Sequence, residues 1–137
     1  MKGGMGVISF KGFEPTGSSP IYLQIIKHIK VSAVSGDASN GDELPSRRSL
    51  SAMLGINPNT VQKAYRLLED EGIISTVPGA KSILDISPEK LASIKIELLQ
   101  STALSAVKSM IEMHITKDDA FRVMEELWDK EEKGESK

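Results

Sequence analysis

The sequence has no cysteine, few aromatic residues and no long apolar run. Without cysteine, disulfides, thiolate zinc sites and cysteine nucleophiles are excluded. Aromatic residues make up only 4% of the chain, so an aliphatic core of Leu, Ile, Val, Ala and Met is expected. No apolar segment approaches the roughly 20 residues of a membrane helix, and the N-terminal residues lack the apolar stretch of a signal peptide. We therefore expect a soluble cytoplasmic protein that does not enter a membrane.

The residue types that build active sites are also sparse. The chain has no glycine-rich phosphate loop and no recognisable pair of nucleophile and base. Its two histidines, His28 and His114, lie far apart, although Asp118 and Asp119 follow the second one closely. Isolated histidines are more often surface or core residues than metal ligands. We expect no enzymatic activity, no cofactor and no metal.

The net charge of −2 conceals an uneven distribution of charged residues along the chain. Residues 46–66 contain four basic residues and no acid, whereas the residues after 88 contain eleven acids and eight bases. A local basic block of this kind suits contact with nucleic acid, and an acidic remainder suits an appendage with another role. On the charge distribution alone, ordinary variation along a charged surface is an equally good explanation.

Three segments can be distinguished by pattern. Residues 1–19 are rich in glycine and read as a flexible lead-in, with residues 6–10 compatible with a short strand. Residues 20–87 alternate helical stripes with turn formers, and residues 88–137 contain two further helical patterns. A first helix is expected over about 20–35, with Ser19 as its N-cap and Pro20 in its first turn.

Two helices separated by a few residues follow this first helix. Ser46 is expected to cap a short helix with Leu50 and Met53 facing inward, and Gly55 to end it. Asn57 then caps a third helix, with Pro58 in its first turn. Its buried stripe is expected to contain Val61, Ala64, Tyr65, Leu67 and Leu68. Two helices joined tightly around a glycine indicate a helix-turn-helix.

Residues 73–77 and 82–86 read as two strands joined by a glycine-containing turn. A hairpin directly after the third helix is a wing, so residues 20–87 predict a winged helix-turn-helix domain. The fold class is therefore mainly α with a small β-hairpin. A two-helix appendage is expected to follow it, with a helix over about 88–114 and a second over about 117–132 capped by Thr116.

This arrangement predicts which residues meet DNA, because the start of the second helix of a helix-turn-helix enters the major groove. Short polar side chains can pair there with base edges, while the more distant basic residues meet phosphates. A phosphate can also be held at the start of the preceding helix. The candidate DNA-binding residues are Ser46, Arg47, Arg48, Asn57, Asn59, Thr60, Gln62, Lys63, Arg66 and, in the wing, Gly79, Lys81 and Ser82.

Other roles remain open for several of these residues. Asn57 is expected to act mainly as a cap, and either Arg47 or Arg48 could instead pair with Asp42 or Glu43. Tyr65 has the spacing of a core residue and is not expected to stack on a base. A winged helix that binds protein rather than DNA is the alternative to a sequence-specific DNA-binding protein.

Residues 20–85 resemble the DNA-binding domain of the GntR family of bacterial repressors. The matching residues are Pro20, Tyr22 and Gln24, the run Leu44-Pro45-Ser46 with Arg48 and Leu50, the pairs Thr60-Val61 and Ala64-Tyr65, and Leu68-Glu69 with Glu71-Gly72. The resemblance implies that Arg48 contacts a phosphate, that the third helix reads bases at its start, and that the wing tip enters the minor groove.

Three positions depart from the family pattern. Many members carry arginine where this chain has Pro58 and another basic residue where it has Gln62. The wing usually has Gly-x-Gly and then an aromatic residue, whereas this chain has Gly79-Ala80-Lys81-Ser82-Ile83. Fewer phosphate contacts imply weaker binding of a single DNA-binding domain to DNA, or an unusual operator.

The appendage of about fifty residues resembles the YtrA-type subfamily, whose short helical tail serves dimerisation. The residues support the same role, because a helix on the order of 40 Å long cannot bury its apolar face against one short helix. The candidate dimer-interface residues are Leu91, Ile94, Leu98, Leu99, Val107, Met110, Phe121, Met124, Leu127 and Trp128. The resemblance implies a homodimeric repressor on double-stranded operator DNA, controlling a transporter or resistance operon that includes its own gene.

A pocket for a small apolar effector is another use of the same region. Methionine and aromatic side chains, here Met110, Met113, Phe121, Met124 and Trp128, adapt to varied apolar ligands. Such residues more often belong to a core or an interface, so both uses stay open.

Overall fold

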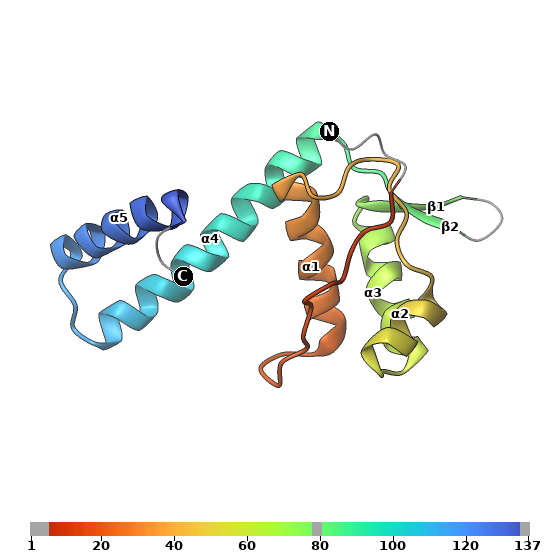
Figure 1. Cartoon of the computed structure of the whole chain (residues 1–137), viewed down its shortest axis with the longest axis horizontal. Helices are drawn as coiled ribbons and strands as arrows, with labels where there is room; N and C mark the ends of the chain where they lie inside the picture. Colours follow the sequence, from red (N-terminus) through yellow and green to blue (C-terminus); the bar gives the residue numbers. More distant parts are fainter. Residues whose placement is uncertain (1–5, 78–80, 135–137) are drawn as a thin grey trace. The chain divides into compact units, whose positions relative to one another are not determined.

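The computed structural model of the chain describes residues 6–77 and 81–134. Within them the elements are α1 (Ile21–Ser35), α2 (Arg47–Leu54), α3 (Pro58–Asp70), β1 (Ile74–Val77), β2 (Lys81–Leu84), α4 (Pro88–Glu112) and α5 (Lys117–Lys133). The chain divides into two compact units, Met1–Ile96 and Glu97–Lys137, and this division falls inside α4. The predicted order of three helices, a hairpin and two helices is confirmed (Figure 1).

Helix α1 begins one residue later than expected. Pro20 has an extended backbone, with a ψ of 141°, and occupies the N-cap position, so the prediction of Ser19 as N-cap and Pro20 in the first turn is wrong. The side chain of Gln24 supplies local hydrogen bonds at this end, because its Nε2 donates to the carbonyls of Thr16 and Ser19. Gly36 ends the helix with a φ of 86°, a left-handed conformation that glycine adopts without a Cβ clash.

The two capping residues predicted for α2 and α3 are confirmed. The Ser46 hydroxyl accepts a hydrogen bond from the Ser49 backbone N–H at 3.0 Å. The Asn57 side-chain oxygen accepts one from the Asn59 N–H at 2.8 Å. Gly55 ends α2 with a φ of 67°. These caps fix the short turn, and α3 then packs against both α1 and α2.

Apolar side chains from every element of the first unit form its core. The fully buried ones include Ile25 and Ile29 of α1, Leu50 of α2, Val61 and Leu68 of α3, Leu84 of β2 and Ile94 of α4. Two predicted core residues lie at its edge instead. Met53 is 61% exposed because α2 is short and turns only Leu50 and Ser51 fully inward, and Leu67 lies on the exposed side of α3.

The segment before α1 is packed against the unit, which differs from the lead-in expected for residues 6–19. Ile8 and Phe10 are buried, and the segment runs alongside α1 (Figure 1). The ring of His28 stacks at 4.4 Å from that of Phe10, and its Nε2 forms a hydrogen bond with the Ser9 carbonyl. Instead of a full strand, Val7 makes one bridge to Glu43, which itself bridges to Ile83 in strand β2 of the hairpin.

The second unit has no buried side chain among its described residues, 97–134. The Thr116 hydroxyl caps α5 by accepting from the Asp119 N–H, as predicted. Helix α4 ends at Glu112, so His114, which the helix expected over about 88–114 included, lies in the turn with a φ of 59°. Large apolar side chains lie exposed on both helices: Leu99, Leu104, Val107, Ile111, Phe121, Val123, Met124, Leu127 and Trp128.

Candidate nucleic-acid interface

Helix α3 has a continuous polar face opposite its buried face. Asn59, Gln62, Lys63 and Arg66 are all exposed and recur at the helical spacing i, i+3, i+4 and i+7. Val61, Ala64, Tyr65 and Leu68 occupy the other side and are buried. Three of the exposed side chains, those of Asn59, Gln62 and Arg66, make no hydrogen bond or ion pair within residues 6–77 and 81–134. This face therefore offers amide and guanidinium groups to a partner without breaking an internal contact.

Two of the candidate residues on α3 are less free than the sequence suggested. Lys63 places its ammonium 4.0 Å from the centre of the Tyr22 ring on α1, a cation–π contact. Thr60 is half-buried, and its N–H donates to the Asn57 carbonyl in the first turn. Lys63 is part of the exposed polar face and Thr60 adjoins it, so contact with a partner remains a prediction for each.

The start of α2 carries the second group of candidate residues. Ser46, Arg47 and Arg48 are exposed, and Ser46 uses its hydroxyl oxygen as the cap. Neither arginine forms an ion pair with a described residue, so the suggested pairing with Asp42 or Glu43 does not occur. Asp42 is buried and accepts hydrogen bonds from the Gly6 and Ser39 N–H groups. The positive end of the helix dipole and two uncommitted guanidinium groups thus coincide, which favours an anion such as phosphate.

Tyr65 connects α3 to the segment just before α2. Its side chain is 2% exposed, and its hydroxyl donates to the Pro45 carbonyl at 2.7 Å, just before α2. Burial raises the pKa of the Tyr65 hydroxyl, and nearby Arg47 opposes this rise only weakly. The residue is a core residue, as its spacing predicted.

The wing retains one exposed basic residue next to its turn. Strands β1 and β2 pair antiparallel, with Ile74 opposite Leu84 and Val77 opposite Lys81. The Lys81 ammonium lies 3.2 Å from a carboxylate oxygen of Glu43 and remains largely exposed. Ser82 is half-buried, and its carbonyl accepts from the Leu44 N–H. Gly79, also predicted to meet DNA, lies outside the described residues.

The candidate dimer-interface residues fall into two groups. Leu98, Leu99, Val107, Met110, Phe121, Met124, Leu127 and Trp128 lie in the second unit and are half-exposed or exposed. Leu91 is half-buried in the first unit. Ile94 is only 1% exposed in the single chain because it completes the core of the first unit, so its assignment to the interface is wrong. The remaining assignments stay predictions.

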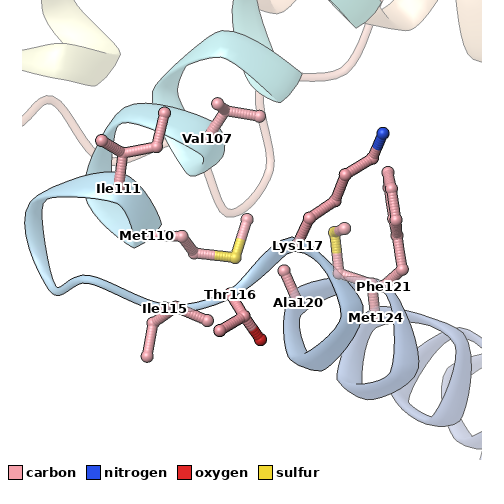
Figure 2. A pocket seen from close by; sticks show the side chains of 9 residues that line it. All are labelled: Val107, Met110, Ile111, Ile115, Thr116, Lys117, Ala120, Phe121 and Met124. Atoms are coloured by element: carbon pink, nitrogen blue, oxygen red, sulfur yellow. The ribbon is translucent and has the colours of Figure 1, made fainter.

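An apolar pocket of about 290 Å³ lies within the second unit (Figure 2). Side chains from the end of α4, the following turn and the start of α5 line it: Val107, Met110, Ile111, Ile115, Thr116, Lys117, Ala120, Phe121 and Met124. Three of the five residues suggested for an effector pocket are therefore present, while Met113 and Trp128 do not line it. The walls are almost entirely hydrocarbon, so they suit an apolar group.

The described residues contain no group of three or more His, Asp or Glu side chains arranged to hold a metal ion. None of the helices in the described part of the chain is long and apolar enough to cross a membrane.

Sequence reasoning missed the residues that hold the start of α4 to the rest of the first unit. Asn40 exchanges two hydrogen bonds with Ile86, and Glu71 pairs with both Lys30 and Lys90. These partners lie between 19 and 46 positions apart, so no local pattern could have revealed them.

Comparison with known proteins places these features in a family context. The family model for bacterial regulatory proteins of the gntR family matches residues 21–81. The HTH-type transcriptional repressor YtrA of Bacillus subtilis (strain 168) is 41% identical over 93 residues, which cover 64% of this chain and 72% of that protein. The uncharacterized HTH-type transcriptional regulator YhcF of the same organism is 34% identical over 102 residues, covering 74% and 84%.

A solved structure extends the similarity to the fold. The GntR family transcriptional regulator from Listeria monocytogenes matches with a TM-score of 0.72 and 29% identity, over 82% of this chain and 98% of that one. Together with the family model, this match confirms the predicted fold class, a winged helix-turn-helix domain followed by C-terminal helices.

Proposed function

Because the chain belongs to the GntR family of bacterial regulatory proteins, we propose that it is a dimeric, sequence-specific transcriptional repressor that occupies operator DNA in the cytoplasm. The observation that carries this proposal is the exposed polar face of α3, whose amide and guanidinium groups have no internal partner among the described residues. Asn and Gln amides can pair bidentately with adenine in the major groove, and Arg66 can reach a base or a phosphate.

Phosphate contacts would come from the start of α2 and from the wing. Arg47 and Arg48 stand at the positive end of α2 within a block that contains no acid. Lys81 lies at the start of β2, next to the turn of the hairpin, and its pairing with Glu43 is exposed enough to be exchanged for a phosphate. Ser46 and Asn57 would act mainly through the caps that aim the two helices.

Dimerisation would use the second unit. Its described residues bury no side chain, yet they expose apolar groups such as Phe121, Leu127 and Trp128. A helical pair without a core is not stable by itself, and a second copy would remove this surface from water. We call the winged helix-turn-helix domain of each copy its reading head. The two reading heads of a dimer would then face half-sites about one DNA turn apart.

Repression of a transporter or resistance operon, including the gene of the repressor itself, follows from the subfamily resemblance. The B. subtilis relative is itself named a repressor. The apolar pocket of the second unit could admit a small apolar effector, and a dimer partner that fills the pocket is the competing use.

The proposal is tested by genome-wide footprinting, followed by binding measurements on the recovered operator. Replacing Asn59 and Gln62 together with alanine should weaken operator binding at least about tenfold, since each bidentate contact contributes about 1–3 kcal/mol. Weak, salt-sensitive binding to unrelated DNA should survive. Arg48→Ala should weaken both kinds of binding and lower the salt slope by about one.

The matched control is Gln100→Ala, an exposed amide on the second unit. It should leave both kinds of binding unchanged. A protein that binds no promoter, or that binds operator equally well after Arg48→Glu, would contradict the proposal and favour a winged-helix domain that binds protein.

A further inference from the structure

The backbone that leads into α4 is held by one side chain from the loop between α1 and α2. Asn40 donates from its Nδ2 to the Ile86 carbonyl at 2.9 Å, and the Ile86 N–H donates to Asn40 Oδ1 at 2.8 Å. The Ile86 side chain is itself buried. Two antiparallel hydrogen bonds to one amide fix both the position and the rotation of this peptide segment.

A single carboxylate then joins α4 to two other helices. Glu71, the C-cap residue of α3, places Oε2 3.2 Å from the Lys30 ammonium on α1 and 3.5 Å from the Lys90 ammonium on α4. Lys30 is buried, so its charge needs a nearby anion, and this requirement holds Glu71 in place. The first turn of α4 is thereby tied to the end of the helix proposed to read DNA.

The start of α4 is also fixed by an N-cap and by packing in the core. Ser87 caps the helix by accepting from the Lys90 N–H at 3.0 Å, and Ile94 is buried in the core of the first unit. The residues from 86 to 94 therefore form part of the reading head. From residue 97 onward, the same helix belongs to the unit proposed to dimerise.

We propose that Asn40 and Glu71 are positioning residues that set the spacing between DNA half-sites. They fix the direction in which α4 leaves the reading head, and α4 continues into the dimerising unit. The inference rests on the proposed function, because only a dimer on DNA has a half-site spacing. Neither residue touches DNA in this scheme, so neither should alter which bases one head prefers.

The test compares the full-length wild type with Asn40→Ala and Lys90→Ala on a series of operators. The half-sites are identical, and the spacer changes by one base pair at a time. The measured quantity is the ratio of affinities between the best spacer and those one base pair longer or shorter, because this ratio does not depend on the active fraction of a preparation. Both variants should lower the ratio by about three- to tenfold, as expected for the loss of one partly buried ion pair or hydrogen-bonded pair.

Lys90→Ala keeps Lys30 paired with Glu71, so it preserves the fold even if Asn40→Ala does not. Lys95→Ala is the matched control, since Lys95 is exposed on the same helix and has no ion pair with a described residue. It should keep the wild-type ratio. A sharp spacing optimum that persists in Lys90→Ala, and in Asn40→Ala where that variant folds, overturns this inference alone. A wild type that binds all spacers equally also overturns this inference alone, whereas a wild type that binds no operator overturns the proposed function as well.

Discussion

Removing the Tyr65 hydroxyl should destabilise the reading head at neutral pH. The hydroxyl donates to the Pro45 carbonyl at 2.7 Å, and this hydrogen bond connects α3 to the segment two residues before α2. Tyr65→Phe removes this hydrogen bond and leaves the Pro45 carbonyl without the tyrosine as a donor. A net hydrogen bond contributes about 1 kcal/mol, and leaving a partly buried acceptor without its partner adds to the cost, so we expect a loss of about 1–2 kcal/mol. In a domain of this size, each kcal/mol lowers Tm by roughly 4–8 °C.

The same tyrosine predicts how stability depends on pH. Burial raises the pKa of Tyr65 in the folded state above the ordinary value of 10.0. Above pH 10 the unfolded chain therefore loses a proton that the folded chain retains. The stabilising contribution is complete below pH 10 and decreases as the pH rises above it, by up to about 1.4 kcal/mol per pH unit. The phenylalanine variant lacks this contribution, so the difference between the two proteins should narrow above pH 10.

Urea unfolding followed by circular dichroism measures both effects, at one fixed protein concentration because association changes apparent stability. Tyr22→Phe is the matched control at neutral pH, since it keeps an aromatic ring beneath Lys63. It should change stability by much less than Tyr65→Phe. Equal stability of wild type and Tyr65→Phe at pH 7.5, or a gap that stays constant up to pH 11, would refute the reasoning.

Two further changes probe the cap of α3 and the apolar face of α5. Asn57→Ala removes the acceptor for the Asn59 N–H and should cost about 1 kcal/mol in urea unfolding, whereas Asn57→Asp keeps the acceptor and most of the stability; equal losses in both variants would show that the cap is unimportant. Phe121→Asp places a charge on the exposed apolar face and should convert the dimer to a monomer in light scattering, while Lys133→Asp, on the opposite face of α5, should not; a Phe121→Asp dimer would disprove the assigned interface.

Features determined by neighbouring residues could be predicted from the sequence. The caps at Ser46, Asn57 and Thr116 depend on hydrogen bonds that reach only two or three residues along the chain. The left-handed turn at Gly55 is equally local. For the same reason the exposed face of α3 could be assigned from helical spacing alone.

Features determined by distant residues could not be predicted. Ile8 and Phe10 lie in a glycine-rich segment without periodicity, and they are buried only because α1 and its His28 ring lie beside them. Ile94 has the spacing of the apolar face of α4, but its side chain is buried in the core of the first unit and is therefore not available to a dimer partner. The pairing of Glu71 with Lys30 and Lys90 needs three helices in place.

The β-bridges of Glu43 have a consequence for how the protein folds while it is being synthesised on the ribosome. Glu43 joins Val7 on one side to Ile83 on the other, so residues 7, 43 and 83 must all be present before this set of bridges is complete. Contacts between such distant positions must wait until the later residue has been synthesised. Helices α1 to α3 can form as they emerge, but the bridge from Glu43 to Ile83 cannot form until residue 83 has left the exit tunnel. The bridges that begin at Val7 are thus completed only after α1, α2 and α3 have been synthesised.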